Sequence, residues 1–557
     1  MDVKRLILFV VLSFSILFFW NAWQEKHRPI EPVVATQDDI PTKTTIAAVD
    51  KEKETQFRLQ TDKRISVQTD LFKAEIDTMG ADIRQLELTQ HRADNSDANN
   101  FVLLSDQIAP SVYVIQSGIA IDGLATHKEV FTSATNTYQM AADQNELKVS
   151  LEWLSPAGVK LTKTYTFVRG SYEVKVDQVI INGSGFALEP LAYYQIIHDS
   201  ESNQGTKMMP TFTGGAYFTD ADKFKKVNFG DMSKEPLSKL AKDGWVGLVQ
   251  HYFVSAWIPQ AKESQEFYTK DLGNKIFAIG TKMSLSSVAP GASKDLNAKL
   301  YMGPQTHDDL VKAAPGLEYT VDYGWLSFIA SPLFMILSII QDVVGNWGYS
   351  IILLTVLIKL AFYPLSASGY RNMAQMRELA PRLQSLKEKF GDDRQKMQQG
   401  MMELYKKEKI NPMGGCLPIL VQIPVFISLY WMLLASVEMR NAPFVLWITD
   451  LSAPDSLFGH IPEFLPLIGG MPIGLLPILM GISMIIQTKL NPKPADPMQA
   501  KVMAIMPIVF SVFFFFFPAG LVLYWLVNNV LSIAQQARIN HLIHAATLAK
   551  KKGNAVR

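Results

Sequence analysis

Long apolar runs that contain no Asp or Glu limit the folds available to this chain. A bilayer core ~30 Å thick is crossed by ~20 apolar residues of α-helix at ~1.5 Å per residue. Joined as one helix, the last two runs would reach ~50 Å, so we place a turn at Pro518. We therefore predict six membrane-spanning helices in the runs 6–23, 347–363, 417–437, 473–487, 502–517 and 520–535.

The first apolar run has the features of an uncleaved membrane anchor. Lys4 and Arg5 precede it, and it ends at Trp20 and Trp23. A cleaved signal peptide would end in small residues, whereas tryptophans are typical of a membrane interface. We expect residues 1–23 to anchor the chain with its N-terminus in the cytoplasm.

Basic and acidic loops alternate along the chain. Residues 366–411 carry ten Lys or Arg against six acids, and the chain after residue 535 carries five basic residues and no acid. The loop 438–471 carries Arg440 alone against four acids. Since basic loops stay in the cytoplasm, we expect a multi-pass protein of the bacterial inner membrane. Both termini would be cytoplasmic and residues 24–343 periplasmic, with Arg440 as the one discordant charge.

The remaining segments differ in their periodicity. Residues 145–182 alternate apolar and polar residues and are broken at 156–158 and 169–171, which predicts antiparallel strands of a sandwich. In 366–411, apolar residues recur every three or four positions on either side of a break at 391–393, which predicts a helical hairpin. Pro381 suits the first turn of a helix in that hairpin.

The fold class we predict is a polytopic α-helical membrane protein of six spans, with a large all-β periplasmic domain and a cytoplasmic helical hairpin. The segments, in order, are an anchor (1–23), a linker (24–60), the periplasmic β-sandwich domain (61–323), an interfacial amphipathic helix (324–343), a core with spans two to six (344–540) that includes the hairpin 366–411, and a basic cytoplasmic tail (541–557).

Lys359 lies inside the second run, where no carboxylate is available to pair with it. One alternative, from position alone, is that the lysine lies near the end of the span and extends its ammonium group to the headgroups. The other alternative is a wet groove open to the cytoplasm. Thr355, one turn before Lys359, and the polar residues Gln422 and Asn528 of other spans favour the groove when they are considered together. Five further polar residues of the spans add to this groove: Ser483, Gln487, Asn529, Gln535 and Gln536.

Several chemistries are disfavoured by what the sequence lacks. Cys416 is its only cysteine, which excludes a disulfide within the chain and a cysteine-based metal site. No phosphate-binding or zinc motif is evident, so we expect no cofactor and no metal. A solute transporter would usually need an intramembrane carboxylate. An envelope enzyme could use His198, Asp199 and Glu201, but such a polar cluster is usually a solvated loop.

Four segments carry a resemblance to a known family: "GNWGYSIILLTVLIKLAFYPLS", "NPMGGCLPILVQIPVFISLYWML", "DPMQAKVMAIMPIVF" and "FPAGLVLYWLVNN". Together with the anchor and the large periplasmic domain, they resemble the YidC/Oxa/Alb membrane insertases of the Gram-negative type. The resemblance implies an insertase and chaperone that is not an enzyme. It implies insertion and folding of inner-membrane proteins through a cytoplasm-open hydrophilic groove, alone or with the Sec translocon.

The resemblance also implies roles for particular residues. Lys359 matches a basic groove position that is usually Arg and that attracts acidic residues of incoming chains. We expect Lys359 to keep this role. Its hydrogen-bond geometry should be less fixed, because lysine lacks the planar fork of arginine. Thr355, Phe426, Tyr524 and Trp525 match a polar position and three aromatic positions, and Trp525 stands where a second tyrosine is common.

The partners that the resemblance implies are nascent inner-membrane proteins, the Sec translocon and the lipid bilayer. The ribosome and the signal recognition machinery would meet the hairpin and the basic tail, with no direct nucleic-acid enzymology. The periplasmic domain resembles a β-supersandwich related to sugar-binding folds. That kinship concerns the fold and implies no sugar chemistry.

Overall fold

The computed structural model describes most of the chain after residue 58. The described residues are 59–93, 99–106, 112–121, 124–200, 211–260, 264–390, 393–408, 417–462, 469–491 and 497–555. The expected anchor, nearly all of the expected linker, Glu201 and Cys416 lie outside them. The described chain forms two compact units: a β unit of 59–322 with 435–441, and a helical unit of 323–434 with 442–555.

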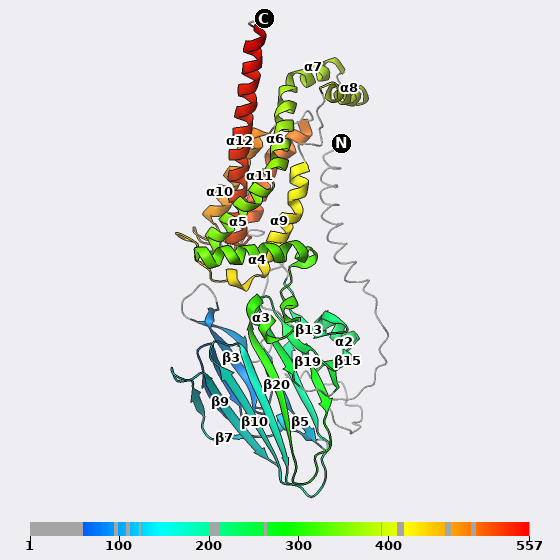
Figure 1. Cartoon of the computed structure of the whole chain (residues 1–557), viewed down its shortest axis with the longest axis vertical. Helices are drawn as coiled ribbons and strands as arrows, with labels where there is room; N and C mark the ends of the chain where they lie inside the picture. Colours follow the sequence, from blue (N-terminus) through cyan, green and yellow to red (C-terminus); the bar gives the residue numbers. More distant parts are fainter. Residues whose placement is uncertain are drawn as a thin grey trace. The chain divides into compact units, whose positions relative to one another are not determined.

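Two large sheets make up the β unit (Figure 1). The first has eleven strands. Its main order is β15 (Ser238–Ala241), β18 (Gln265–Asp271), β19 (Ile276–Ser284), β12 (Leu191–Asp199), β5 (Tyr113–Ile121), β3 (Asp82–Arg92), β2 (Phe72–Asp77), β1 (Arg64–Gln68) and β8 (Thr137–Gln139), with β4 (Asn100–Leu104) on β3 and β6 (Leu124–Ala125) on β5.

The second sheet has nine strands. Their order is β14 (Lys223–Val227), β13 (Gly214–Thr219), β16 (Trp245–Val249), β17 (Phe253–Pro259), β20 (Ser293–Pro304), β11 (Glu173–Asn182), β10 (Val159–Val168), β9 (Glu146–Leu154) and β7 (Thr132–Ser133). Short helices complete the unit: η1 (Thr126–Lys128), α2 (Phe229–Lys234), α3 (His307–Ala313), η2 (Leu317–Thr320) and η5 (Val437–Met439).

The alternation in 145–182 produces the predicted strands. β9 buries every second residue, and β10 pairs antiparallel with both β9 and β11. The breaks fall at the predicted turns, where Gly158 and Gly170 have φ angles of +91° and +69°. The large all-β domain is therefore confirmed as two mainly antiparallel sheets, with β1 and β8 as a parallel pair.

Large apolar side chains form the core of the β unit. Trp245 and Trp257 are fully buried, and the Trp257 ring lies 4.9 Å from that of Tyr194 on the opposite sheet. Aromatic pairs at this spacing contribute ~0.5–1.5 kcal/mol beyond their buried area. This core holds the two sheets together.

The helical unit contains nine described α-helices (Figure 1). They are α4 (Ser327–Val344, preceded by η3, Gly324–Leu326), α5 (Trp347–Ala361), α6 (Tyr363–Glu378), α7 (Ala380–Phe390), α8 (Arg394–Lys407), α9 (Leu417–Ala435), α10 (Leu475–Leu490), α11 (Pro497–Phe514) and α12 (Ala519–Ala555). A turn separates α11 from α12 at Pro518, and Pro381 lies in the first turn of α7.

Few of these helices satisfy a strict test for crossing a bilayer. Among the described residues, Gly324–Val344 is long and apolar enough alone, and α5 with α6 would make a second span, bent by 67°. The other apolar helices found are shorter: Leu420–Ala435, Leu475–Leu490 and Ala500–Phe514. The six spans, the interfacial placement of 324–343 and the cytoplasmic hairpin therefore stay predictions.

Candidate functional site

The candidate site lies around α12, which contacts α5, α6 and α10. Polar residues occupy two faces of this helix. Asn528 and Ser532 are four residues apart and share one face, whereas Asn529 and Gln536 are seven apart and share another. The two faces meet different neighbours, so their polar groups have different roles.

Lys359 is joined to the first face of α12. Its Nζ donates to Ser532 Oγ at 2.7 Å, and Ser532 Oγ donates to the Asn528 carbonyl oxygen at 2.7 Å. The side chain of Asn528 in turn accepts from Gln422 Nε2 of α9 at 2.6 Å. A polar line therefore runs from α5 through α12 to α9 and contains three of the predicted residues.

Ser532 is a further candidate residue of this site, and it is not among the residues predicted from the sequence. It lies one helical turn after Asn528, and that spacing was the available signal. Its hydroxyl can accept from Lys359 because its own hydrogen goes to the backbone of the preceding turn. This arrangement fixes the position of the Lys359 ammonium.

The ammonium of Lys359 keeps hydrogen-bonding capacity. An ammonium has three donors, and the described residues use one of them, at Ser532. No carboxylate of the described chain lies within ion-pair distance of Lys359. A partly buried cation with open donors can attract an acidic group from elsewhere, because an unpaired charge in this setting is unfavourable.

The three predicted aromatic residues do come together. The Phe426 ring of α9 lies 4.3 Å from that of Trp525 in a T-shaped pair, and 6.3 Å from that of Tyr524. Phe426 is one turn after Gln422 on α9, so the aromatic contact and the polar line share the α9–α12 pair. This places an apolar surface next to the polar one.

Thr355 lies apart from this line. It is buried, and its hydroxyl donates to the Ile351 carbonyl of its own helix at 2.6 Å. Back-bonding of this kind satisfies the donor within the helix. In the described structure, Thr355 is therefore close to Lys359 in sequence without any hydrogen bond to it.

The second face of α12 links helices. Asn529 donates to Ser483 Oγ of α10 at 3.2 Å, and Gln536 donates to Asn491 Oδ1, just after α10, at 3.2 Å. Hydrogen bonds of this kind are common between helices in membranes. These three residues of the groove hypothesis are thus accounted for by helix association.

Two residues of the possible enzyme site in the β unit, His198 and Asp199, lie in the described part of the chain. The Asp199 carboxylate accepts from the Val112 backbone N–H at 2.7 Å, and His198 contacts the Asp199 carbonyl oxygen and Gln250 Nε2. Both residues are buried, and burial lowers the pKa of His198 to about 4. The histidine is therefore neutral at physiological pH and sits in the fold as a packed polar residue, not in a solvated loop.

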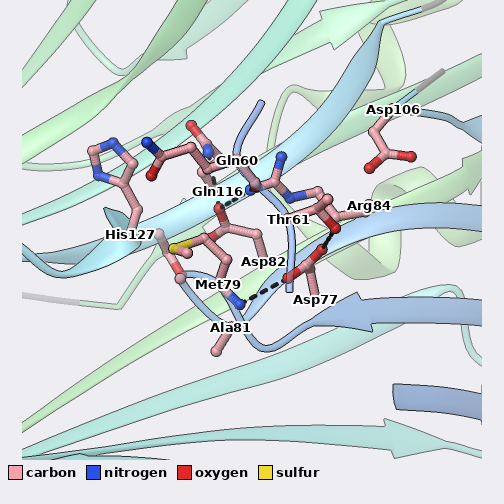
Figure 2. Close-up of polar contacts among 12 residues, drawn as sticks. Gln60, Thr61, Asp77, Met79, Ala81, Asp82, Arg84, Asp106, Gln116 and His127 are labelled. Carbon is pink, nitrogen blue, oxygen red and sulfur yellow. Dashed lines mark hydrogen bonds and ion pairs between the residues drawn. The ribbon is translucent and has the colours of Figure 1, made fainter. Parts of the chain in front are cut away.

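A second polar cluster in the β unit surrounds Asp82 (Figure 2). Its carboxylate accepts from Gln116 Nε2 at 2.8 Å and pairs with Arg84 at 3.4 Å and Lys163 at 3.8 Å. Lys163 also donates to the carbonyl oxygens of Gly80 and Ser117, both at 2.7 Å. Burial raises the pKa of Asp82, while the two cations oppose that rise. The two cations share one carboxylate, and Lys163 is also held by backbone carbonyl groups, so the charged groups are held by the fold itself, which indicates a structural role.

Metal binding finds no support in the described residues. No group of three or more His, Cys, Asp or Glu side chains there could hold a metal ion. The described side chains of the candidate site offer one cation, amides, hydroxyls and aromatic rings.

Comparison with known proteins identifies the family of the chain. Residues 64–336 match the model of the YidC periplasmic domain, and 339–546 match that of the 60Kd inner membrane protein. The chain is 60% identical to "Membrane protein insertase YidC" of Methylobacillus flagellatus, with all of both chains covered. It is 47% identical to the protein of that name from Aromatoleum aromaticum, over 98% of each chain.

A solved structure shows a weaker similarity to the chain. It is titled "Active YidC insertase crystal structure with the first transmembrane domain resolved" and has a TM-score of 0.39 at 18% identity, over 86% of this chain and 92% of that one. The names of the curated relatives describe insertases and not enzymes. On the full-length identity with those relatives, the chain belongs to the YidC family of membrane protein insertases.

Proposed function

We propose that this protein inserts other proteins into the inner membrane and that Lys359 attracts acidic residues of the incoming chain. The observation that carries the proposal is a partly buried ammonium with open donors and no carboxylate partner in the described structure. The family and the names of its full-length relatives support the overall activity.

The polar line and the aromatic contact would act in sequence. Lys359, Ser532 and Gln422 would receive the polar leading segment of a substrate, and Phe426 and Trp525 would contact its apolar segment. Release follows as ~20 apolar residues transfer into hydrocarbon, which supplies the free energy for insertion. Because no bond is made or broken, the protein needs no catalytic group.

The proposal includes a topology. Six spans would cross the inner membrane, with both termini in the cytoplasm and residues 24–343 in the periplasm. The basic hairpin 366–411 and the basic tail would receive nascent chains from the ribosome and the signal recognition machinery. Action beside the Sec translocon and a chaperone role in folding complete the proposal, which has its support in the loop charges and the family.

Ser532 would hold Lys359 in place by accepting one hydrogen bond from its ammonium group. A lysine is a point charge with rotatable donors, whereas an arginine presents a planar fork. A single acceptor such as Ser532 can hold a lysine and leave its other donors for a substrate. We therefore expect Lys359→Arg to remain active with altered substrate preference.

The test uses a depletion strain that carries Lys359→Ala, Lys359→Arg or the wild-type chain. Each is given a substrate with an acidic leading segment and a matched substrate in which Asp and Glu are changed to Asn and Gln. We expect Lys359→Ala to lower insertion of the acidic substrate about tenfold, which corresponds to ~1.4 kcal/mol, and to change the amidated substrate little. Equal insertion of both substrates by Lys359→Ala and Lys359→Arg would show that the electrostatic role is wrong.

A further inference from the structure

Arg440 is the charge that the topology leaves unexplained, since it lies alone among acids in a loop expected on the periplasmic side. It belongs to the β unit, together with the rest of residues 435–441. The segment 435–441 directly follows α9, so the chain enters the β unit a second time at this point. The contacts of Arg440 explain why a cation is present there.

The guanidinium of Arg440 rests on two stacked aromatic rings. It lies 5.0 Å from the ring centroid of Phe101 and 5.5 Å from that of Phe253, and these two rings are 4.2 Å apart. A guanidinium at this distance is attracted to the ring face. Phe101 is on β4 of the first sheet and Phe253 on β17 of the second, so one side chain contacts both sheets.

Backbone carbonyls complete the site for Arg440. Its Nη2 donates to the carbonyl oxygens of Arg92 and Ala93, at the end of β3. The His91 ring lies 5.4 Å from that of Phe253, and its pKa is lowered to about 4, first by burial and then by the charge of Arg440. A neutral His91 leaves Arg440 as the one cation over these rings.

The residues beside Arg440 are also packed. Val437 and Met439 are 3% and 1% exposed. Glu438 lies between them in sequence, and its pKa is raised to about 7 by burial, with Asp308 and Asp309 of α3 adding to the rise. Because the apolar side chains on both sides of Glu438 are buried, this segment packs as part of the β unit and is not a solvated surface loop.

We propose that residues 435–441, which continue the chain from α9, are a docking segment within the β unit, and that Arg440 is the residue that holds it there. Its receptor is formed by Phe101, Phe253 and the carbonyl groups at the end of β3. The recognition requires a planar cation that stacks on a ring while it donates in its own plane. Lysine carries the same charge but lacks this geometry.

Residues 435–441 continue the chain directly from α9, and the chain leaves the β unit again at Ala442. The docking itself is independent of the function proposed for the groove, so the two can fail separately.

Hydrogen–deuterium exchange of the full-length protein in lipid nanodiscs tests the docking. The variants are Arg440→Ala and Arg440→Lys, with Lys312→Ala of α3 as a control because that cation is exposed. We expect both Arg440 variants to exchange about tenfold faster in 436–441 and at the ends of β3 and β4. Strands β9 to β11 should stay protected, and Lys312→Ala should match the wild type.

Three outcomes would overturn the proposal. Unchanged exchange in Arg440→Ala would show that the segment is held without this residue. Wild-type protection in Arg440→Lys would show that charge alone suffices. Faster exchange throughout β9 to β11 in Arg440→Ala would mean that Arg440 is required by the whole sandwich and is not a local anchor.

Discussion

Replacing Lys163 by methionine is the sharpest test of what holds the two sheets together. Lys163 is on β10 of the second sheet, is fully buried and donates to carbonyl oxygens of Gly80 and Ser117 at 2.7 Å. It also pairs with Asp82 of the first sheet at 3.8 Å. Burial lowers the pKa of Lys163 to about 8, although Asp82 opposes this, so the ammonium is mainly protonated at neutral pH.

The cost of the substitution follows from the groups that it leaves behind. Methionine fills the volume but offers no donor, so two buried carbonyl groups lose their charged partner and Asp82 keeps Arg84 and Gln116. Breaking one partner of a buried ion pair costs ~3–5 kcal/mol. We expect Lys163→Met to lose about that much free energy of unfolding of the β unit.

A double variant, Asp82→Asn with Lys163→Met, measures how much of the stability comes from the ion pair between these two residues. Asp82→Asn can still accept from Gln116 but removes the carboxylate that pairs with both Lys163 and Arg84, so we expect it also to cost ~3–5 kcal/mol. Combined with Lys163→Met, it should cost less than the sum of the single changes, because both changes break the same ion pair. Urea unfolding of the full-length protein in detergent, followed by far-UV circular dichroism, measures each value. A loss below ~1 kcal/mol for Lys163→Met, or strict additivity in the double variant, would refute the reasoning.

Two further predictions concern pH and the candidate site. Burial lowers the pKa of His127 to about 3. As the pH falls below about 6.5, the unfolded chain therefore binds a proton at this histidine that the folded chain does not, and the free energy of unfolding falls. The stability of the wild type relative to His127→Asn should fall by ~1.4 kcal/mol per pH unit between pH 6 and 4 in urea titrations, and a pH-independent difference would contradict this. Ser532→Ala removes the acceptor that positions Lys359, so we expect thermal stability in detergent to fall by ~0.5–2 kcal/mol and insertion of acidic substrates to fall less than in Lys359→Ala. Insertion and stability equal to the wild type would show that Ser532 does not position the lysine.

The β-sandwich was predictable because its signal is local. Alternation in β9, β10 and β11 requires one face of each strand to be buried, and the glycines at 158 and 170 mark the turns. The helices of the C-terminal part were predictable for the same reason, from runs of apolar residues. The family resemblance was correct because its motifs span much of that part, and the relatives confirm it over the full length.

The long-range polar contacts were beyond sequence reasoning. Lys163 stands in a strand as one of several lysines, and nothing in its neighbours indicates burial against residues 46 to 83 positions away. Ser532 acquires its role from Lys359, 173 positions earlier. Arg440 seemed discordant because its aromatic partners, Phe101 and Phe253, belong to another part of the chain. Contacts of this kind depend on the assembled fold and leave no periodicity.

Residue type alone therefore does not separate functional polar groups from structural ones in this chain. Asn528 and Asn529 are adjacent asparagines on α12, yet one is joined to Gln422 on the Lys359 side and the other is joined to Ser483 of α10. The two asparagines differ in the hydrogen-bond donors that remain available close to them. The Asn529 amide donates to the Ser483 hydroxyl between two packed helices. Asn528 is linked through Ser532 to the Lys359 ammonium, which still has open donors. Under the proposed function, a substrate that brings a carboxylate would gain from that open cation, and insertion would begin on the Lys359 side of α12.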